Sequence, residues 1–363
     1  MLISDVDTPA LLINLDRLRA NIDRMAHLAR NADMKLRPHT KTHKCVEIAK
    51  MQLEAGASGI TVAKVGEAEV MAEAGIDDIL IAHEVVGAAK IERLVQLAKR
   101  AKIAVGVDSV EAAMPLSMML AQHGMRLRVL IEVDIGLHRC GVQPDAAVDF
   151  ARAINALPGL NLVGLFAYPG HVYAARNENE AAGIAAYECR IMSDVAHRVG
   201  PLASIAGWIS GGSTPTAPHY HSECGLTEMR PGSYVFGDRT QIDRWSAKPG
   251  DCAMTVLATV VSTPEPGRAV LDAGSKALAS DLAPASAGHG MLKEDNAAVV
   301  VKVNEEHGFV DLSQSHLKLR VGDKVEVIPN HCCAATNLYD EMLIVKDSEV
   351  VETWRVAARG KLR

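Results

Sequence analysis

Aromatic residues are scarce in this chain of 363 residues, because Phe, Trp and Tyr together make up only 4% of it. Surfaces that bind single-stranded nucleic acid stack the bases on aromatic side chains, so this composition does not favour one. An excess of positive charge is also missing, since 44 Asp and Glu against 38 Lys and Arg leave a net charge of −6. Nucleic-acid-binding domains usually carry a basic patch. We therefore expect no nucleic-acid partner.

Long apolar runs are absent as well. No run approaches the ~18 residues typical of a membrane-spanning helix. The N-terminal stretch lacks the features of a secretory signal, because Asp5 and Asp7 stand where such a peptide carries Lys or Arg, and Pro9 interrupts its apolar part. Cysteine is sparse and odd in number, with seven residues, which is no disulfide framework. We therefore expect a protein of a reducing compartment, the cytoplasm, with no membrane association.

The balance of 48% hydrophobic and 23% charged residues is that of a globular protein. From residue 10 to about 240, short apolar runs alternate with amphipathic stretches, as in an α/β protein. The eight predicted strands are 10–14, 34–39, 59–64, 78–83, 102–108, 127–134, 162–168 and 205–210. Eight strands separated by helices indicate a closed (β/α)₈ barrel of the TIM type. A doubly wound open sheet is the alternative, and we favour the barrel because no GxGxxG motif opens any of these units.

The pattern changes near Gly250. Beyond it, apolar runs are separated by turn signals such as PEPG and KDSE, with little helical periodicity. This pattern is typical of an antiparallel β domain. We therefore predict a barrel domain over residues 11–247 and a C-terminal β domain over residues 248–363, to which residues 1–10 belong.

The first candidate site is the run RPHTKTHK at residues 37–44, at the end of a predicted barrel strand. In an extended segment Arg37, His39, Lys41 and His43 would share one face. The C-terminal ends of barrel strands are where catalytic residues lie. Cationic neighbours disfavour the ammonium form of a lysine, which makes Lys41 a candidate amine nucleophile toward carbonyl groups. A solvated basic loop is the alternative.

The second candidate site is the run SGGSTPT at residues 210–216, after a late strand. Glycines allow backbone N–H groups to form an anion-binding nest, and hydroxyls add donors. Phosphate sites in barrels often follow the seventh and eighth strands. The candidate residues are Gly211, Gly212, Ser213 and Thr214, with a weaker candidate at Tyr234 in the run GSY. A plain turn between strand and helix is the alternative.

The third candidate site is the run PNHCC at residues 329–333. In an extended segment His331 and Cys333 would face one way and Cys332 the other. An imidazole and a thiolate that converge suit a zinc ion. Two protein ligands would leave open positions, as in a catalytic site. Two buried apolar thiols beside a capping histidine are the alternative.

Three further side chains follow predicted strands. Arg139, in the run RCGV, could bind a ring nitrogen of a cofactor or pair with a carboxylate. Tyr168 and His171, in the run AYPGHVY, could be acid–base or ring-stacking groups.

Taken in order, RPHTKTHK, RCGV, SGGSTPT, MRPGSYVF, LDAG, EEHG and PNHCC resemble the D-threonine aldolase and D-serine dehydratase family. The members are pyridoxal-phosphate enzymes of fold type III, with an alanine-racemase-like barrel and a C-terminal β domain. The resemblance extends from DTPALLINLD to WRVAARG. It implies a pyridoxal 5'-phosphate cofactor, a divalent metal (zinc or manganese) and a homodimer.

The resemblance also implies a role for individual residues. Lys41 resembles the lysine that binds the cofactor covalently, with His39 beside it. The residues Gly211, Gly212, Ser213 and Thr214 resemble the phosphate-binding loop. Tyr168 and Arg139 occupy motifs near the cofactor ring, and His331 and Cys333 match the metal pair.

Two reactions occur within the family, and single motifs point to each. HEVVG (83–87), NLYDE (337–341) and WRVAARG (354–360) resemble the aldolases, whereas the His-x-Cys pair, GGSTPT and GHVY (170–173) resemble the dehydratases. The aldolase-like segments are longer, so we expect cleavage of a D-3-hydroxy amino acid to glycine and an aldehyde, with His171 and His83 as candidate bases. The alternative is a D-serine or D-3-hydroxyaspartate dehydratase. A racemase or a non-catalytic carrier of the cofactor has no use for the metal pair.

Overall fold

A computed structural model describes residues 1–202 and 207–363. It contains two compact units, each assembled from separate stretches of chain. One comprises Met25–Lys41, Ile48–Gly232 and Gly360–Arg363, and the other comprises Met1–Arg24, Thr42–Glu47 and Ser233–Arg359. We call them the barrel unit and the sheet unit. No helix in the described part of the chain is both long and apolar enough to cross a membrane.

The barrel unit is built on eight parallel strands in the order β2-β9-β8-β7-β6-β5-β4-β3. The strands are β2 (Lys35–Leu36), β3 (Ile60–Val62), β4 (Asp78–Ile81), β5 (Lys102–Val107), β6 (Leu127–Val133), β7 (Leu160–Ala167), β8 (Trp208–Gly211) and β9 (Glu228–Met229). A parallel bridge between His39 and Thr61 joins the two edge strands of this order. The predicted (β/α)₈ barrel is therefore confirmed.

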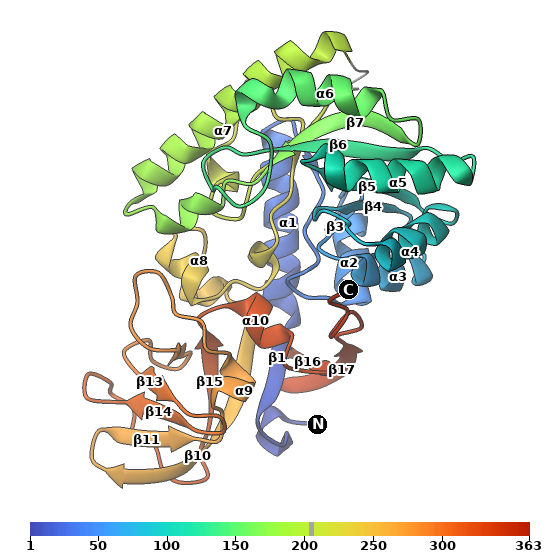
Figure 1. Cartoon of the computed structure of the whole chain (residues 1–363). Helices are drawn as coiled ribbons and strands as arrows, with labels where there is room; N and C mark the ends of the chain where they lie inside the picture. The colour runs from blue at the N-terminus through green and yellow to red at the C-terminus, as the bar shows by residue number, and fades with distance from the viewer. Residues whose placement is uncertain (203–206) are drawn as a thin grey trace. The chain divides into compact units, whose positions relative to one another are not determined.

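The helices of the barrel unit lie outside its strands (Figure 1). They are α2 (Val46–Glu54), α3 (Val65–Glu73), α4 (Ala88–Ala98), α5 (Val110–Gln122), α6 (Ala147–Asn155) and α7 (Glu178–Val199). Helix α1 (Leu15–Asn31) begins in the sheet unit and ends in the barrel unit. Helix α4 illustrates their pattern, because Ile91, Leu94 and Val95 recur at helical spacing and are buried. Helix α7 begins at a cap, where the Asn177 side chain accepts a hydrogen bond from the backbone N–H of Glu180.

Side chains fill the interior of the barrel. Leu80, Ala104, Leu130 and Phe166 come from four neighbouring strands and form one buried cluster. Gly106 on β5 is required beside it, because a Cβ atom there would lie 2.6 Å from the Phe166 ring. The barrel is thus a packed core, and its loops are left to form a site.

The set of barrel strands differs from the predicted one at both ends. Residues 10–14 form β1 (Ala10–Asn14), which lies in the sheet unit and not in the barrel. The eighth barrel strand is β9. It has only two residues, so it carries no apolar run from which a strand could be predicted. The predicted strand 205–210 begins outside the described residues, and β8 starts at Trp208.

The sheet unit contains a nine-stranded sheet in the order β11-β14-β13-β12-β15-β10-β1-β16-β17. Its later strands are β10 (Met254–Glu265), β11 (Arg268–Leu271), β12 (Gly290–Leu292), β13 (Val299–Val303), β14 (Gly308–Asp311), β15 (Lys324–Pro329), β16 (Glu341–Lys346) and β17 (Glu349–Arg355). Three short helices belong to this unit: α8 (Arg239–Asp243), α9 (Ser275–Leu278) and α10 (Cys332–Thr336). The sheet is antiparallel as predicted, except that β1 pairs with β16 in parallel.

These units divide the chain differently from the predicted domains 11–247 and 248–363 with 1–10. Strand β1 pairs with β10 and β16, so the sheet unit includes more of the N-terminus than expected. The segment from Ser233 to residue 247 also belongs to it. Strand pairing between distant stretches, which composition does not reveal, sets this division.

Candidate active site

Side chains from several motifs of the barrel unit lie close together where its strands end. Tyr168 directly follows β7, and Arg139 lies in the loop after β6. The Lys41 Nζ atom lies 5.6 Å from the centroid of the Tyr168 ring, and the Arg139 guanidinium carbon lies 5.1 Å from it. A phenol ring between two cations is an arrangement stabilised by cation–π attraction. Lys41, Arg139 and Tyr168, predicted from separate motifs, therefore form one group at the C-terminal ends of the strands.

His39 belongs to the same group. Its Nδ1 atom lies 3.5 Å from the backbone nitrogen of Lys41. Burial, followed by the positive charges of Lys41, Arg230 and Arg139, holds the pKa of His39 well below its ordinary value. His39 is therefore a neutral imidazole at physiological pH and adds no further positive charge to the group.

Arg230 is a member of this group that the sequence reasoning did not name. It follows β9 and is only 5% exposed. Its Nη2 atom donates to the Ala167 carbonyl over 2.6 Å, and its guanidinium lies 5.0 Å from the Phe166 ring centroid. The Nη1 atom is buried and has no hydrogen-bond partner among the described residues. Such an unpaired donor is costly and calls for an acceptor atom of a bound group.

The predicted common face of Arg37, His39, Lys41 and His43 is wrong, because β2 ends at Leu36 and the chain then turns. The Arg37 side chain pairs with Glu228 over 2.8 Å and with Asp78 over 3.0 Å, inside the barrel. His43 belongs to the sheet unit, where it packs edge-on against Phe236. Arg37 therefore has a structural role within the barrel.

The glycine-rich loop after β8 is buried and tightly hydrogen-bonded. Gly212 donates its backbone N–H to the Glu188 carboxylate over 2.9 Å, and Ser213 donates its own to the Thr216 hydroxyl over 2.9 Å. These two N–H groups therefore serve the loop's own conformation. The predicted phosphate-binding role of Gly211, Gly212, Ser213 and Thr214 stays a prediction. The conformation of this loop is held by hydrogen bonds to the acceptors Glu188 and Thr216.

The two candidate bases differ in their surroundings. His171 lies in η3 (Gly170–Ala174), and its Nδ1 atom is buried with no partner among the described residues. Burial lowers the pKa of His171. His83 is half exposed, and its ring nitrogen lies 3.0 Å from the carbonyl oxygen of Glu84. Tyr234, the weaker cofactor candidate, is buried in η6 (Ser233–Val235) of the sheet unit.

The predicted metal pair lies at the start of α10, not in an extended segment. His331 is the N-cap residue, and Cys333 is the second residue of the helix. The Cys333 Sγ atom lies 3.2 Å from the Thr42 hydroxyl, whereas Cys332 is fully buried and donates its backbone N–H to Asp238. Hydrogen bonds from Cys332 and His331 hold the pKa of Cys333 well below its ordinary value. A thiolate beside an imidazole is the donor chemistry that zinc prefers.

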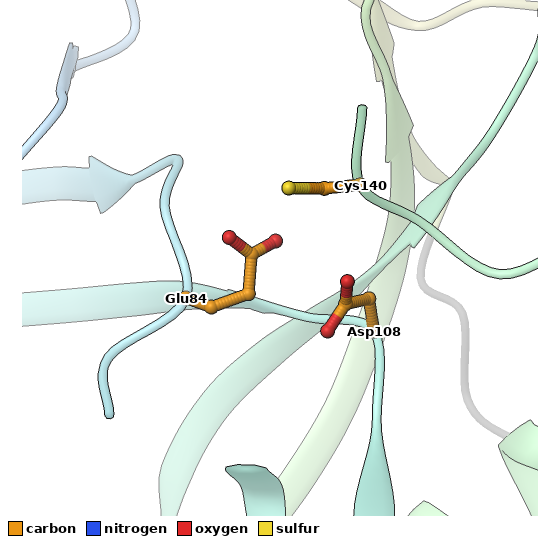
Figure 2. A group of neighbouring side chains, drawn as sticks. All are labelled: Glu84, Asp108 and Cys140. Atoms are coloured by element: carbon orange, nitrogen blue, oxygen red, sulfur yellow. The ribbon is translucent and has the colours of Figure 1, made fainter. Parts of the chain in front are cut away.

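A further cluster lies at the same ends of the barrel strands (Figure 2). Glu84, Asp108 and Cys140 follow β4, β5 and β6, and one ligand atom from each lies within 4.8 Å of the others. Burial and a hydrogen bond with Glu84 raise the pKa of the neighbouring Glu132. Burial and the nearby carboxylates also raise the pKa of the Cys140 thiol. Within the cluster the Cys140 sulfur is therefore a protonated thiol, and we assign the cluster no ligand.

The described chain contains one disulfide, between Cys189 on α7 and Cys224 in the segment before β9. The sequence reasoning, which found no disulfide framework, did not anticipate it. The partners are 35 residues apart and both are buried. The bond therefore ties α7 to the segment that leads into the last barrel strand.

Comparison with known proteins places this architecture. Residues 13–240 match the family model "Alanine racemase, N-terminal domain", and residues 253–345 match the "Putative serine dehydratase domain". The chain is 37% identical to D-threonine aldolase of Arthrobacter sp. over 358 residues, covering 98% of this chain and 93% of that protein.

Two solved structures are similar along nearly the whole chain. D-threonine aldolase from Filomicrobium marinum has a TM-score of 0.88 at 33% identity, covering 100% of this chain and 99% of that one. D-threo-3-hydroxyaspartate dehydratase from Delftia sp. HT23 has a TM-score of 0.90 at 30% identity, covering 98% of each.

The barrel, the antiparallel sheet and the group around Lys41 together define a fold type III, alanine-racemase-like enzyme. Within that class, the chain belongs to the D-threonine aldolase and D-serine dehydratase family. It is therefore a lyase that depends on pyridoxal phosphate, as the sequence motifs predicted. The residues present fit this cofactor, because the unpaired Nη1 donor of Arg230 needs an acceptor and Lys41 supplies an amine in the same group.

Proposed function

We propose that this enzyme is a D-threonine aldolase-like lyase that cleaves D-3-hydroxy amino acids to glycine and an aldehyde. The observation that carries the proposal is the 37% identity to a D-threonine aldolase along 98% of the chain. The group around Lys41 provides the matching chemistry. The substrate is thus a small D-amino acid with a β-hydroxyl.

The cofactor, when bound, withdraws electrons from a bond at the α-carbon of an amino acid. Lys41 would hold it covalently through its amine. Tyr168 and Arg139, which lie together, would contact its ring, and Arg230 would donate its unpaired Nη1 hydrogen to an acceptor atom of the group. The loop from Gly211 to Thr214 would hold the phosphate. The roles of Lys41 and of the loop follow the family resemblance, and those of Tyr168, Arg139 and Arg230 are supported by their contacts in the barrel unit.

A proton acceptor is needed for the substrate's β-hydroxyl, because cleavage leaves that oxygen as a carbonyl. His171 is our first candidate, since burial lowers its pKa and keeps the imidazole neutral at physiological pH. Its unpaired Nδ1 atom is buried. His83 is the second candidate, and its half-exposed ring makes it the weaker one.

His331 and Cys333 would hold a divalent metal, zinc or manganese. The depressed pKa of Cys333 supports thiolate ligation. A bound metal would act as a Lewis acid toward a hydroxyl group. We also propose a homodimer in the cytoplasm, in keeping with the family. The Cys189–Cys224 disulfide counts against a reducing compartment, where such bonds are rare.

A dehydratase is the second candidate, and a specific observation favours it. D-threo-3-hydroxyaspartate dehydratase of Delftia sp. HT23 matches the whole fold about as well as the aldolase does. Here Lys41 would remove the proton from the α-carbon, and the β-hydroxyl would leave. The two reactions share the cofactor and the metal pair, and they differ in the proton acceptor and in which bond is broken.

Product analysis with D-threonine separates the two. We expect glycine and acetaldehyde in equal amounts, no turnover of L-threonine, and slow or absent deamination of D-serine. The Lys41→Ala variant is the control and should give no product. Formation of 2-oxobutanoate and ammonia without glycine would replace the aldolase proposal by the dehydratase.

A further inference from the structure

The glycine-rich loop after β8 rests on a buried carboxyl group that the proposed reaction does not use. Glu188 on α7 is 0% exposed. One of its oxygens accepts the backbone N–H of Gly212 over 2.9 Å, and the other contacts the hydroxyl of Tyr220. Helix α7 is thereby joined to the loop and to the segment that follows it.

A chain of hydroxyls extends this contact along the loop. The Tyr220 hydroxyl lies 2.8 Å from the Thr216 Oγ1 atom. That atom accepts the backbone N–H of Ser213 over 2.9 Å and lies 3.0 Å from the Ser213 hydroxyl. Glu188 is therefore connected to Gly212 directly, and to Ser213 through two hydroxyl groups.

The two glycines of the loop are fitted to this pair of side chains. A Cβ atom on Gly211 would lie 2.5 Å from the Glu188 carboxylate, within the space its oxygen fills. Gly212 has a φ of +83°, which disfavours any other residue, and a Cβ atom there would lie 3.0 Å from the Tyr220 ring. The GG sequence is thus needed for the approach of Glu188 and Tyr220, besides any approach of a ligand.

The charge of Glu188 is poorly balanced. In the described part of the chain it forms no ion pair, and the titratable or charged groups that face it are Tyr220 and Arg230. Its neighbour Cys189 is held in the disulfide and does not titrate. Burial raises the pKa of Glu188 to about 7, despite the hydrogen bonds from Tyr220 and Gly212.

A phosphate on this loop would bring a second negative charge close to the first. Two anions in a buried site repel strongly, and protonation of the carboxyl removes the repulsion. The hydrogen-bond chain can accommodate that change. A protonated Glu188 donates to the Tyr220 oxygen, and Tyr220 then donates to Thr216. The Thr216 hydroxyl donates in turn to the Ser213 carbonyl, 3.3 Å away. One proton enters from solvent, and no side chain has to move.

We propose that Glu188 is a positioning residue for the cofactor phosphate: it shapes the Gly211–Thr216 loop through Gly212 and Tyr220, and it takes up a proton when the phosphate binds. This inference rests on the proposed function, in particular on the loop as the phosphate site. It implies that the affinity for pyridoxal phosphate falls as the pH rises above about 7, by up to about tenfold per pH unit.

Calorimetric titration of the full-length apoenzyme with pyridoxal phosphate tests the proposal. At pH 8, comparison of two buffers with different ionisation enthalpies gives the number of protons exchanged. The Glu188→Gln variant keeps an acceptor for Gly212 but cannot titrate. We expect the wild type to take up about one proton more than this variant, and the affinity of the variant to be insensitive to pH between 7 and 8.5. Equal proton counts in the two proteins would overturn the inference.

Three comparisons make the result specific. Pyridoxal, which lacks the phosphate, should bind without the extra proton in either protein. Tyr220→Phe removes a hydrogen bond that lowers the pKa of Glu188, so it should reduce the proton uptake at pH 8. It should also weaken binding of pyridoxal phosphate more than of pyridoxal, and a variant in which both ligands weaken equally would argue against positioning. If Thr214→Ala leaves the affinity ratio of the two ligands unchanged, the loop is not the phosphate site, and that part of the proposed function fails instead. Failure of the wild type to bind pyridoxal phosphate at all would contradict the proposed function as a whole.

Discussion

Neighbouring cysteines at the start of α10 have opposite environments. Cys333 lies beside His331 and the Thr42 hydroxyl, and its pKa is held well below the ordinary value. Cys332 is fully buried, and burial raises the pKa of its thiol well above that value. One sulfur therefore suits a metal ion and the other is an apolar core atom.

We predict that Cys333→Ala and His331→Ala do not bind the proposed divalent metal and lose turnover with it, while pyridoxal phosphate stays bound. Cys332→Ala should retain the metal at the wild-type ratio, since its thiol faces the core. Metal content by plasma mass spectrometry and the cofactor absorbance band measure the two effects separately. Equal metal loss from Cys332→Ala and Cys333→Ala would contradict the assignment of ligands.

Sequence reasoning found individual residues best where a local motif carried them. Lys41, Arg139 and Tyr168 each follow a strand, so the common end of a barrel brings them together. Arg37 was misjudged because its partner Glu228 is almost two hundred residues away. Arg230 and Glu188 were missed for a similar reason. The burial of both side chains and the unpaired Nη1 atom of Arg230 depend on long-range packing, which leaves no local pattern in the sequence.

Among the elements, α7 combines two connections to the end of the barrel. Glu188 bonds to the loop after β8, and the adjacent Cys189 is joined to Cys224 before β9. Long-range contacts also explain why residues 10–14 were predicted as a barrel strand. The sequence of β1 resembles that of a barrel strand, and only its pairing with β10 and β16 places it in the sheet unit. The remaining barrel strands were found because parallel buried strands carry continuous apolar runs.

We predict that Cys189→Ser unfolds at lower denaturant concentration than the wild type. A crosslink between residues 35 positions apart stabilises by about 3–4 kcal/mol in the loop-entropy model. Chemical denaturation with and without a reductant measures the effect, and reduction should bring the wild type to the stability of the variant. Cys45→Ser is a control that should keep the wild-type response to reductant, as its thiol is in no disulfide. Alkylation of all seven cysteines in the unreduced, denatured protein would show that the bond does not form.

At the scale of the whole molecule, neither unit is a continuous segment. The sheet unit takes its strand β1 from the N-terminus, and this strand lies between β10 and β16. Leu11, Leu12 and Ile13 are buried there. Without β1, the pair β16–β17 loses its hydrogen bonds to the rest of the sheet.

We therefore predict that a fragment of residues 233–359 does not fold alone. Its heteronuclear NMR spectrum should show poor dispersion, because the strand in the middle of the sheet is missing. A synthetic peptide of residues 1–24, added in excess, should increase the dispersion by restoring β1. A well-dispersed spectrum of the fragment by itself would mean that β1 is dispensable for this sheet.

The place of β1 also has a consequence during synthesis on the ribosome. Its three buried apolar residues leave the exit tunnel long before the parallel partner β16 emerges. At roughly 10 residues per second, the nascent strand waits about half a minute for that partner. The antiparallel partner β10 emerges earlier, but only after all the barrel strands have been made. Until then the apolar side chains and unpaired backbone of β1 are available to chaperones, and its edge toward β16 stays open for longer still.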